Sequence, residues 1–96
     1  MRFEWDPAKG TANRRKHGVT FKEAETVFFD DAALLYDDPD HSTNEERFLL
    51  LGMSAAVRVL VVAHCVRESG EIIRIISARR ATRAETEAYV GKLLTA

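Results

Sequence analysis

Apolar residues in the first third of the chain recur at the spacing of a helix. Residues Thr20–Glu23, at the start of this apolar pattern, form a capping-box sequence, and Val19 before them can pack as a hydrophobic staple. A helix is therefore predicted to begin after Thr20 and to end near Asp30. Its apolar face consists of Phe21, Ala24, Val27 and Phe28.

Capping residues, rather than apolar ones, indicate an earlier helix. Asp6 is a favourable N-cap, and Pro7 follows at the first helical position, where its missing N–H has no cost. Gly18 can adopt the left-handed conformation that ends a helix, and the basic residues before it complement the helix dipole. These signals predict a helix from Pro7 to about Lys16.

Strand-like runs bounded by turn residues fill most of the remaining chain. The short connections between them favour antiparallel hairpins, and a second capping box at Thr82–Glu85 starts a terminal helix to about Leu94. We expect one α+β domain over residues 1–96, with two N-terminal helices, a twisted antiparallel sheet of about four to five strands packed on helices along one face, and a C-terminal helix. The predicted strands are Arg2–Trp5, Ala32–Asp37, Arg47–Met53, Val57–Val66 and Ile72–Ala78.

Charge is nearly balanced over the whole chain but not along it. Fourteen Lys and Arg residues oppose fifteen Asp and Glu residues, so no global positive field indicates nucleic-acid binding. Seven acids lie in residues 30–46, which we interpret as a solvated surface, with attraction to a basic partner as the weaker alternative. The basic residues gather at 14–17 and 74–83, so folding can create a local basic groove.

The single cysteine, Cys65, permits no disulfide within the chain, as is typical of a reducing cytoplasm. No apolar run approaches the roughly 20 residues of a membrane span, and the start of the chain has no signal core. We therefore expect a cytoplasmic protein without membrane contact. His17, His41, His64 and Cys65 match no zinc spacing, so no metal and no cofactor are predicted.

Four arginines within residues 74–83 follow an apolar strand and precede a helix. A guanidinium group suits bidentate contact with phosphate, so this cluster indicates an anionic partner, and RNA is the partner we favour. Arg79 and Arg80 are the leading candidates because they directly precede a helix N-terminus, a natural anion site. A salt bridge from them to Glu85 is the structural alternative.

Cleavage of RNA without a metal needs a base for the 2′-hydroxyl, cationic support for the transition state and an acid for the leaving oxygen. His64 titrates in the right range, although a histidine late in a valine-rich strand is more often structural. Arg74 is equally suited to RNA contact and to an ion pair with Glu46 or Glu71. We expect Arg47, His64 and Arg79 to meet at the open face of the sheet.

Alternation along the strands places Arg58, Leu60, Val62 and His64 on one face of their strand, and it places Arg74 and Arg79 on opposite faces of theirs. The candidates for contact with RNA are Lys9, Asn13, His17 and Tyr89. Each has a structural alternative: solvent exposure, helix capping or core packing. We expect Lys9, His17 and Arg80 at the rim of the site, and the candidates for catalysis are Arg47, His64, Arg74, Arg79 and Arg80.

Three segments carry a longer motif. They read Trp5-Asp6-Pro7-x-Lys9-x3-Asn13-x2-Lys16-His17-Gly18-Val19-x-Phe21-x-Glu23-Ala24, then Glu46-Arg47, then Arg74-Ile-Ile-Ser-Ala-Arg-Arg-Ala-Thr-x2-Glu85-x3-Tyr89. In this order and over nearly the whole chain, they resemble the BrnT family, toxins of type II toxin–antitoxin pairs.

The resemblance implies a RelE-like fold and a ribonuclease that is neutralised by a BrnA-like ribbon-helix-helix antitoxin. It also implies a hetero-oligomer with that antitoxin, through which the complex binds operator DNA. A metal-independent endoribonuclease that arrests translation and growth is the function we expect. The alternative is a non-catalytic module of the same fold that binds nucleic acid or protein.

Overall fold

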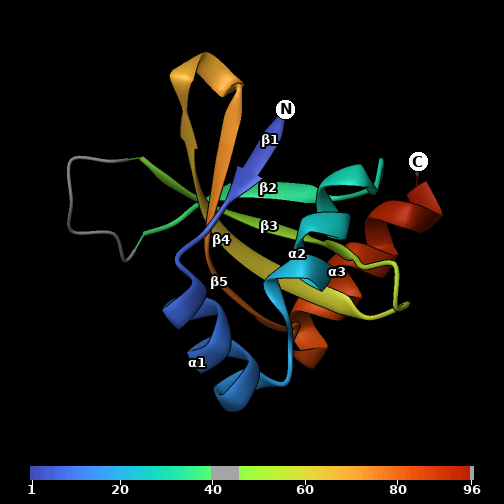
Figure 1. Ribbon diagram of the computed structural model, residues 1–96. Coiled ribbons are helices and arrows are strands. Elements are labelled where there is room, and N and C mark those ends of the chain that lie inside the picture. Colours follow the sequence, from blue (N-terminus) through green and yellow to red (C-terminus); the bar gives the residue numbers. More distant parts are fainter. Residues whose placement is uncertain (40–45, 96) are drawn as a thin grey trace.

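The computed structural model describes residues 1–39 and 46–95, and Figure 1 shows the arrangement of its elements. Asp40, His41 and Glu45, which the sequence analysis considered, lie outside the described residues. In chain order the elements are β1 (Arg2–Glu4), α1 (Pro7–His17), α2 (Phe21–Thr26), the 3-10 turn η1 (Val27–Phe29), β2 (Leu34–Asp37), β3 (Arg47–Met53), β4 (Val59–Arg67), the 3-10 turn η2 (Glu68–Gly70), β5 (Ile72–Arg80) and α3 (Arg83–Thr95).

The capping residues act as the sequence predicts. The Asp6 carboxylate accepts a hydrogen bond from the Ala8 N–H at 2.9 Å, and Gly18 ends α1 with a φ of 69°. Thr20 accepts from the Glu23 N–H at 3.1 Å and starts α2. The second helix is shorter than predicted, because its last turn tightens into η1.

The sheet has the strand order β1-β5-β4-β3-β2. Strands β2 to β5 form the expected antiparallel meander. β1 differs, because it pairs in parallel with β5, so that Glu4 lies opposite Arg74. The sheet is therefore mixed, which corrects the fully antiparallel prediction. Alternation in a sequence identifies a strand but does not give the direction of its partner.

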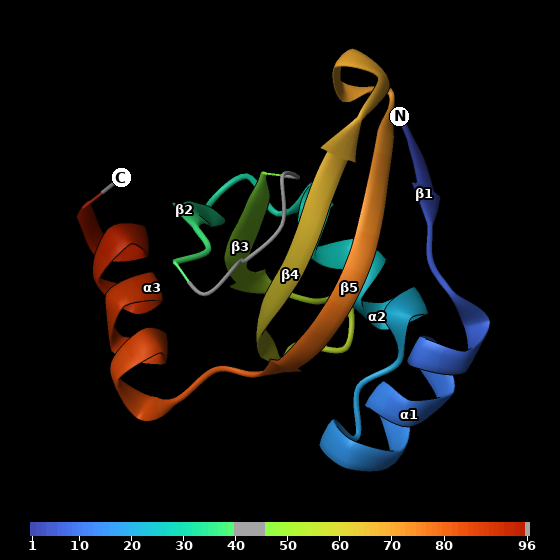
Figure 2. The same ribbon diagram turned by 90° about the vertical axis from the view of Figure 1, so that its left-hand side faces the viewer.

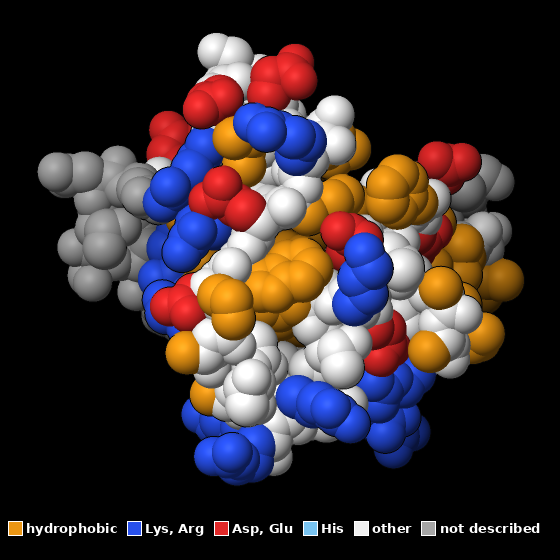
Figure 3. All heavy atoms as spheres, in the orientation of Figure 1, with side chains coloured by type: hydrophobic (Ala, Val, Ile, Leu, Met, Phe, Trp, Pro, Cys, Tyr) orange, Lys and Arg blue, Asp and Glu red, His pale blue; other side chains and the backbone are white. Residues whose placement is uncertain are grey.

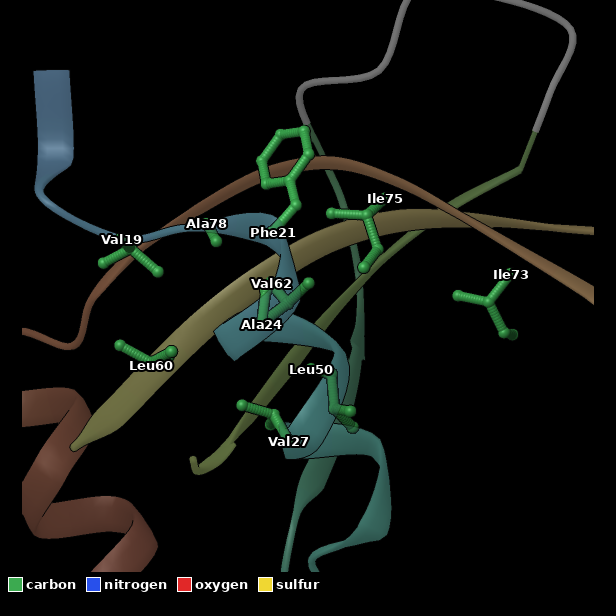
Figure 4. Close-up of a cluster of buried hydrophobic side chains, with 10 residues drawn as sticks. All are labelled: Val19, Phe21, Ala24, Val27, Leu50, Leu60, Val62, Ile73, Ile75 and Ala78. Atoms are coloured by element: carbon green, nitrogen blue, oxygen red, sulfur yellow. The ribbon is translucent and has the colours of Figure 1, made fainter. Parts of the chain in front are cut away.

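Helices lie on both faces of the sheet, not on one as predicted. Figure 2 shows α1 and α2 on one side and α3 on the other. The main core joins α2 to the sheet and is drawn in Figure 4; it contains Leu50, Leu60 and Val62. Their strand neighbours Leu51 and Val61 pack with Tyr89 of α3 on the opposite side. The central strands β3 and β4 are apolar on both faces, so both faces need cover.

A β-bulge in β5 decides where the arginines point. Ala63 pairs with Ser77, whereas its neighbour His64 pairs with Ile75, so Ile76 is the extra residue. Beyond the bulge the alternation shifts by one position, and Ile75 and Ala78 both face the helix-covered core. Arg74 and Arg79 therefore lie on the same face of the sheet, whereas strict alternation predicts opposite faces.

Among the described residues, none of the helices combines the length and the apolar character that a membrane crossing requires.

Candidate nucleic-acid interface

A row of side chains crosses the sheet on the face opposite α1 and α2. The register places Glu4 of β1 beside Arg74 of β5, Arg74 beside Cys65 of β4, and Cys65 beside Arg47 of β3. We call these four residues the charged row. Figure 3 shows Lys and Arg side chains gathered beside the β4–β5 hairpin, with Asp and Glu side chains among them.

At the β1 end of the charged row, one carboxylate lies close to two guanidinium groups. Glu4 Oε2 lies 2.8 Å from Arg74 Nη1 and 3.7 Å from Arg67 Nη1. An ion pair of Arg74 with Glu46 or Glu71 was one of two alternatives in the sequence; the structure shows an ion pair, but with Glu4, because β1 pairs in parallel with β5. The Glu4 carboxylate therefore holds Arg74 closely and also attracts Arg67.

Arg47 occupies the other end of the charged row. Its Nε lies 3.9 Å from Asp38 Oδ2, too far for a hydrogen bond. Within residues 1–39 and 46–95, this buried Nε has no hydrogen-bond partner. Asp37, Asp38, Glu46 and Arg47 together line a hollow of about 400 Å³. A buried donor without a partner is costly, and this Nε is therefore a candidate for contact with a ligand.

Arg79 lies on the same face as the charged row but points to α3. Its two Nη atoms hold Glu85 at 2.8 and 3.0 Å, and Glu85 also accepts from the Thr82 N–H at 2.8 Å. The hydrogen bonds from Arg79 lower the pKa of Glu85 to about 2, against the opposing effect of burial. The structural alternative for Arg79, a salt bridge to Glu85, is therefore what the structure shows.

Arg80 pairs with Leu60 and so faces the side of the sheet covered by α1 and α2. Its side chain is exposed, and its positive charge helps to lower the pKa of Glu23 on α2, although the hydrogen bond from Arg58 is the main cause. The side chains of the two adjacent arginines therefore lie on opposite faces of the sheet, as alternation predicts. They do not combine into one anion site before α3.

His64 does not reach the charged row. It is 2% exposed and lies between Phe28 and Phe48, with ring centroids 4.8 and 5.9 Å away. Burial lowers its pKa below the usual 6.5. Our expectation that His64 meets Arg47 and Arg79 at the open face is wrong, because His64 shares the face of Leu60 and Val62, as the strand alternation itself indicated.

Two of the residues predicted to contact RNA have structural roles. Asn13 is buried, donates to the carbonyls of Val19 and Ala78 at 2.9 and 2.8 Å, and accepts from the Ala78 N–H at 3.0 Å. Tyr89 is 3% exposed and donates its hydroxyl to Asp30 at 2.6 Å. Burial raises the pKa of Tyr89 to about 12, and the hydrogen bond to Asp30 contributes to the same shift.

Lys9 and His17 belong to α1, which lies on the side of the sheet away from the charged row (Figure 2). Lys9 is exposed, and His17 is partly buried at the last position of the helix. The structure thus brings Arg47 and Arg74 together and leaves Lys9, Asn13, His17 and His64 on the other side. Sequence reasoning missed Glu4, Arg67 and Asp38, since only the strand register reveals them as neighbours.

An apolar cavity of about 390 Å³ adjoins the charged row. It lies where β2, β3 and β4 meet α3. Its lining includes Tyr36, Leu49, Leu51, Val61, Glu85 and Ala88. Within the described part of the chain, no three His, Cys, Asp or Glu residues are grouped so that they could hold a metal ion.

Comparison with known proteins identifies the family of this chain. No curated protein matches the chain in sequence. The crystal structure of the Brucella abortus ribonuclease toxin BrnT is similar in fold, with a TM-score of 0.65 and 22% sequence identity over 86% of this chain and 99% of that chain. The family model described as the ribonuclease toxin BrnT of type II toxin–antitoxin systems matches residues 5–85, and the chain therefore belongs to the BrnT family.

Proposed function

We propose that this protein is an endoribonuclease toxin that cleaves RNA and thereby arrests translation and growth. The observation that carries the proposal is the charged row, which sets Arg47 and Arg74 on either side of Cys65, roughly 10 Å apart, on the open face of the sheet. Membership of a family of ribonuclease toxins supports the reaction class.

Two guanidinium groups supply the positive charge and the hydrogen-bond donors that cleavage of a phosphodiester needs. Arg74 is held in place by Glu4, and Arg47 keeps a buried N–H free of partners among the described residues. Fixed cationic donors stabilise the extra charge that develops on phosphorus when a 2′-oxygen attacks. The reaction we propose needs neither a metal nor a cofactor, because the arginines carry the charge compensation.

The groups that we propose for proton transfer are the carboxylates beside these arginines. Asp38 lies beside Arg47, and Glu4 lies beside Arg74. Either group can accept the proton of a 2′-hydroxyl when a phosphate is bound between the two arginines. The 2′-oxygen then attacks phosphorus, the P–O5′ bond breaks, and the leaving 5′-oxygen takes up the proton that the carboxylate accepted. In this proposal Arg79 holds the β5–α3 junction through Glu85, and His64 belongs to the core.

The partner we propose is a BrnA-like ribbon-helix-helix antitoxin, which forms a hetero-oligomer with this chain and carries the operator-DNA contact. A type II family implies a protein antitoxin. The open face offers that partner both charge and apolar surface, with Tyr36 exposed on β2 next to it. An acidic and apolar segment would cover Arg47 and Arg74 and so block access to RNA.

The test is RNA cleavage by the purified protein in the presence of EDTA. We expect products with 2′,3′-cyclic phosphate ends, and a loss of roughly 100-fold or more in rate in Arg47→Ala and Arg74→Ala, as for removal of a transition-state donor. Arg15→Ala is the matched control, because Arg15 is an exposed arginine on α1. An inactive wild type that still binds RNA would favour the non-catalytic binding module instead.

Separate variants distinguish the two candidate bases. Asp38→Asn and Glu4→Gln keep the shape of each side chain and remove its ability to take a proton at neutral pH. Loss of cleavage in one variant alone, with RNA binding retained, identifies the base. Full activity in both variants would remove carboxylate catalysis from the proposal.

A further inference from the structure

We propose that the apolar cavity beside α3 holds one nucleobase of the RNA whose phosphates lie on the charged row. This inference rests on the proposed function and extends it from the reaction to the recognition of the substrate.

The register fixes the position of the cavity relative to the charged row. Leu49, on the cavity floor, follows Arg47 by two residues on the same face of β3, a separation of about 7 Å. On the other side, Val61 pairs with Arg79, whose partner Glu85 lines the cavity. The cavity therefore lies between Arg47 and the Arg79–Glu85 pair, within reach of a nucleotide whose phosphate contacts Arg47.

The lining suits a flat aromatic ring. Leu49, Leu51 and Val61 form an apolar floor, and Tyr36 stands at the side with 46% of its surface exposed. Proteins recognise single-stranded RNA by turning unstacked bases onto such aromatic side chains. A volume of about 390 Å³ lies at the small end of ligand sites, which is appropriate for a single base.

One charged group on the wall distinguishes the cavity from a purely apolar groove. Glu85 is kept ionised by Arg79, and its Oε2 accepts one hydrogen bond from Arg79 Nη2. An ionised carboxylate oxygen can accept two hydrogen bonds, so Oε2 can also receive an amino or ring N–H from a base edge. An aliphatic side chain of a protein partner would leave this acceptor unused, and for this reason we infer a base.

The experiment uses a short RNA of 2′-O-methyl nucleotides, which has no free 2′-hydroxyl and cannot be cleaved. The RNA spans the position at which the wild type cuts its unmodified form. An abasic site is introduced at one position after another, and each Kd is measured by fluorescence anisotropy. We expect one position at which removal of the base weakens binding roughly 5- to 150-fold, as for a stacked base.

Variants connect that position to the cavity. In Tyr36→Ala, intact RNA should bind as weakly as the abasic RNA does to the wild type, and the abasic site should have no further effect. Tyr36→Phe should retain the wild-type pattern. Ala88→Phe, which fills the cavity, should act like Tyr36→Ala, and Ala12→Phe is its control because Ala12 is an exposed alanine on α1.

The outcomes separate this inference from the proposed function. Cleavage of RNA together with a uniform abasic scan would overturn the base site and leave the nuclease intact. Loss of antitoxin binding in Tyr36→Ala, with RNA binding unchanged, would make the cavity a protein-docking site and would also overturn it. A wild type that neither cleaves nor binds RNA would overturn both proposals.

Discussion

Arg79 at the end of β5 and Glu85 in the first turn of α3 form a bidentate ion pair, with Nη1–Oε1 and Nη2–Oε2 distances of 2.8 and 3.0 Å. The same carboxylate completes the capping box with Thr82. One side chain therefore starts α3 and fixes the direction in which the helix leaves the sheet. The wall of the apolar cavity depends on this junction.

Acid should destabilise the protein through Glu85. Its pKa falls from 4.5 in the unfolded chain to about 2 in the folded protein, so its stabilising effect is present above pH 4.5 and is lost as the pH falls toward 2. Because solvent screens this partly exposed pair, we expect a loss of about 1–2 kcal/mol in the free energy of unfolding. Urea denaturation at several pH values between 2 and 6 measures it.

Glu85→Gln should lower stability at pH 6 and flatten this dependence on pH. Glu87→Gln is the control, because Glu87 is more exposed and pairs with Arg83 one turn apart on α3. An unchanged pH profile in Glu85→Gln would show that the Arg79–Glu85 pair is not the source of the acid sensitivity.

His64 should prove dispensable for catalysis. Its ring is buried between Phe28 and Phe48, so His64→Phe should keep RNA cleavage within about threefold of the wild type while removing a titrating group from the core. Burial lowers the pKa of His64, so the unfolded chain takes up its proton first and wild-type stability should fall as the pH drops below 6.5. In His64→Phe this part of the pH dependence should disappear. A folded His64→Phe that no longer cleaves RNA would instead assign proton transfer to His64.

Removing the carboxylate that Arg74 and Arg67 share should strengthen RNA binding. Glu4→Gln adds one net positive charge to the open face, so we expect a lower Kd for uncleavable RNA and a slope of log Kd against log salt that is steeper by about 0.7. Glu25→Gln is the control, because Glu25 pairs with Lys22 on α2. Equal affinities for both variants and the wild type would show that the RNA does not pass Glu4.

Asn13 should be among the most sensitive positions for stability. Its amide donates to the carbonyls of Val19 and Ala78 and thereby joins α1, the segment before α2, and β5. Asn13→Asp places a carboxylate against both carbonyls, and we expect a loss of about 2–4 kcal/mol in the free energy of unfolding. Thr11→Ala, at an exposed position on the same helix, should cost less than about 1 kcal/mol. A stable Asn13→Asp variant would contradict the structural role of this amide.

Local chemistry in the sequence predicts the starts of the helices well. Asp6, Thr20 and Thr82 each provide a side-chain oxygen next to free backbone N–H groups, and each is observed as a cap. The strands are also identified, because their apolar residues and turn signals are contiguous in the chain. These features need no knowledge of distant residues.

The arrangement of the site depends on contacts that the sequence does not encode locally. The bulge at Ile76 turns Arg79 onto the face of Arg74, and no residue in Ile72–Arg80 marks that insertion. Likewise, the acid that holds Arg74 is Glu4, 70 residues earlier in the chain. The arginines could be selected from the sequence by type, but their neighbours follow only from strand order and register.

The parallel pairing of β1 with β5 also bears on when the charged row forms. Glu4 cannot meet Arg74 until nearly four-fifths of the chain has left the ribosome, and closing so long a loop is among the later events of folding. A nascent chain therefore lacks the assembled open face while it is being made. The surface on which we propose RNA cleavage therefore forms late in the synthesis of the chain.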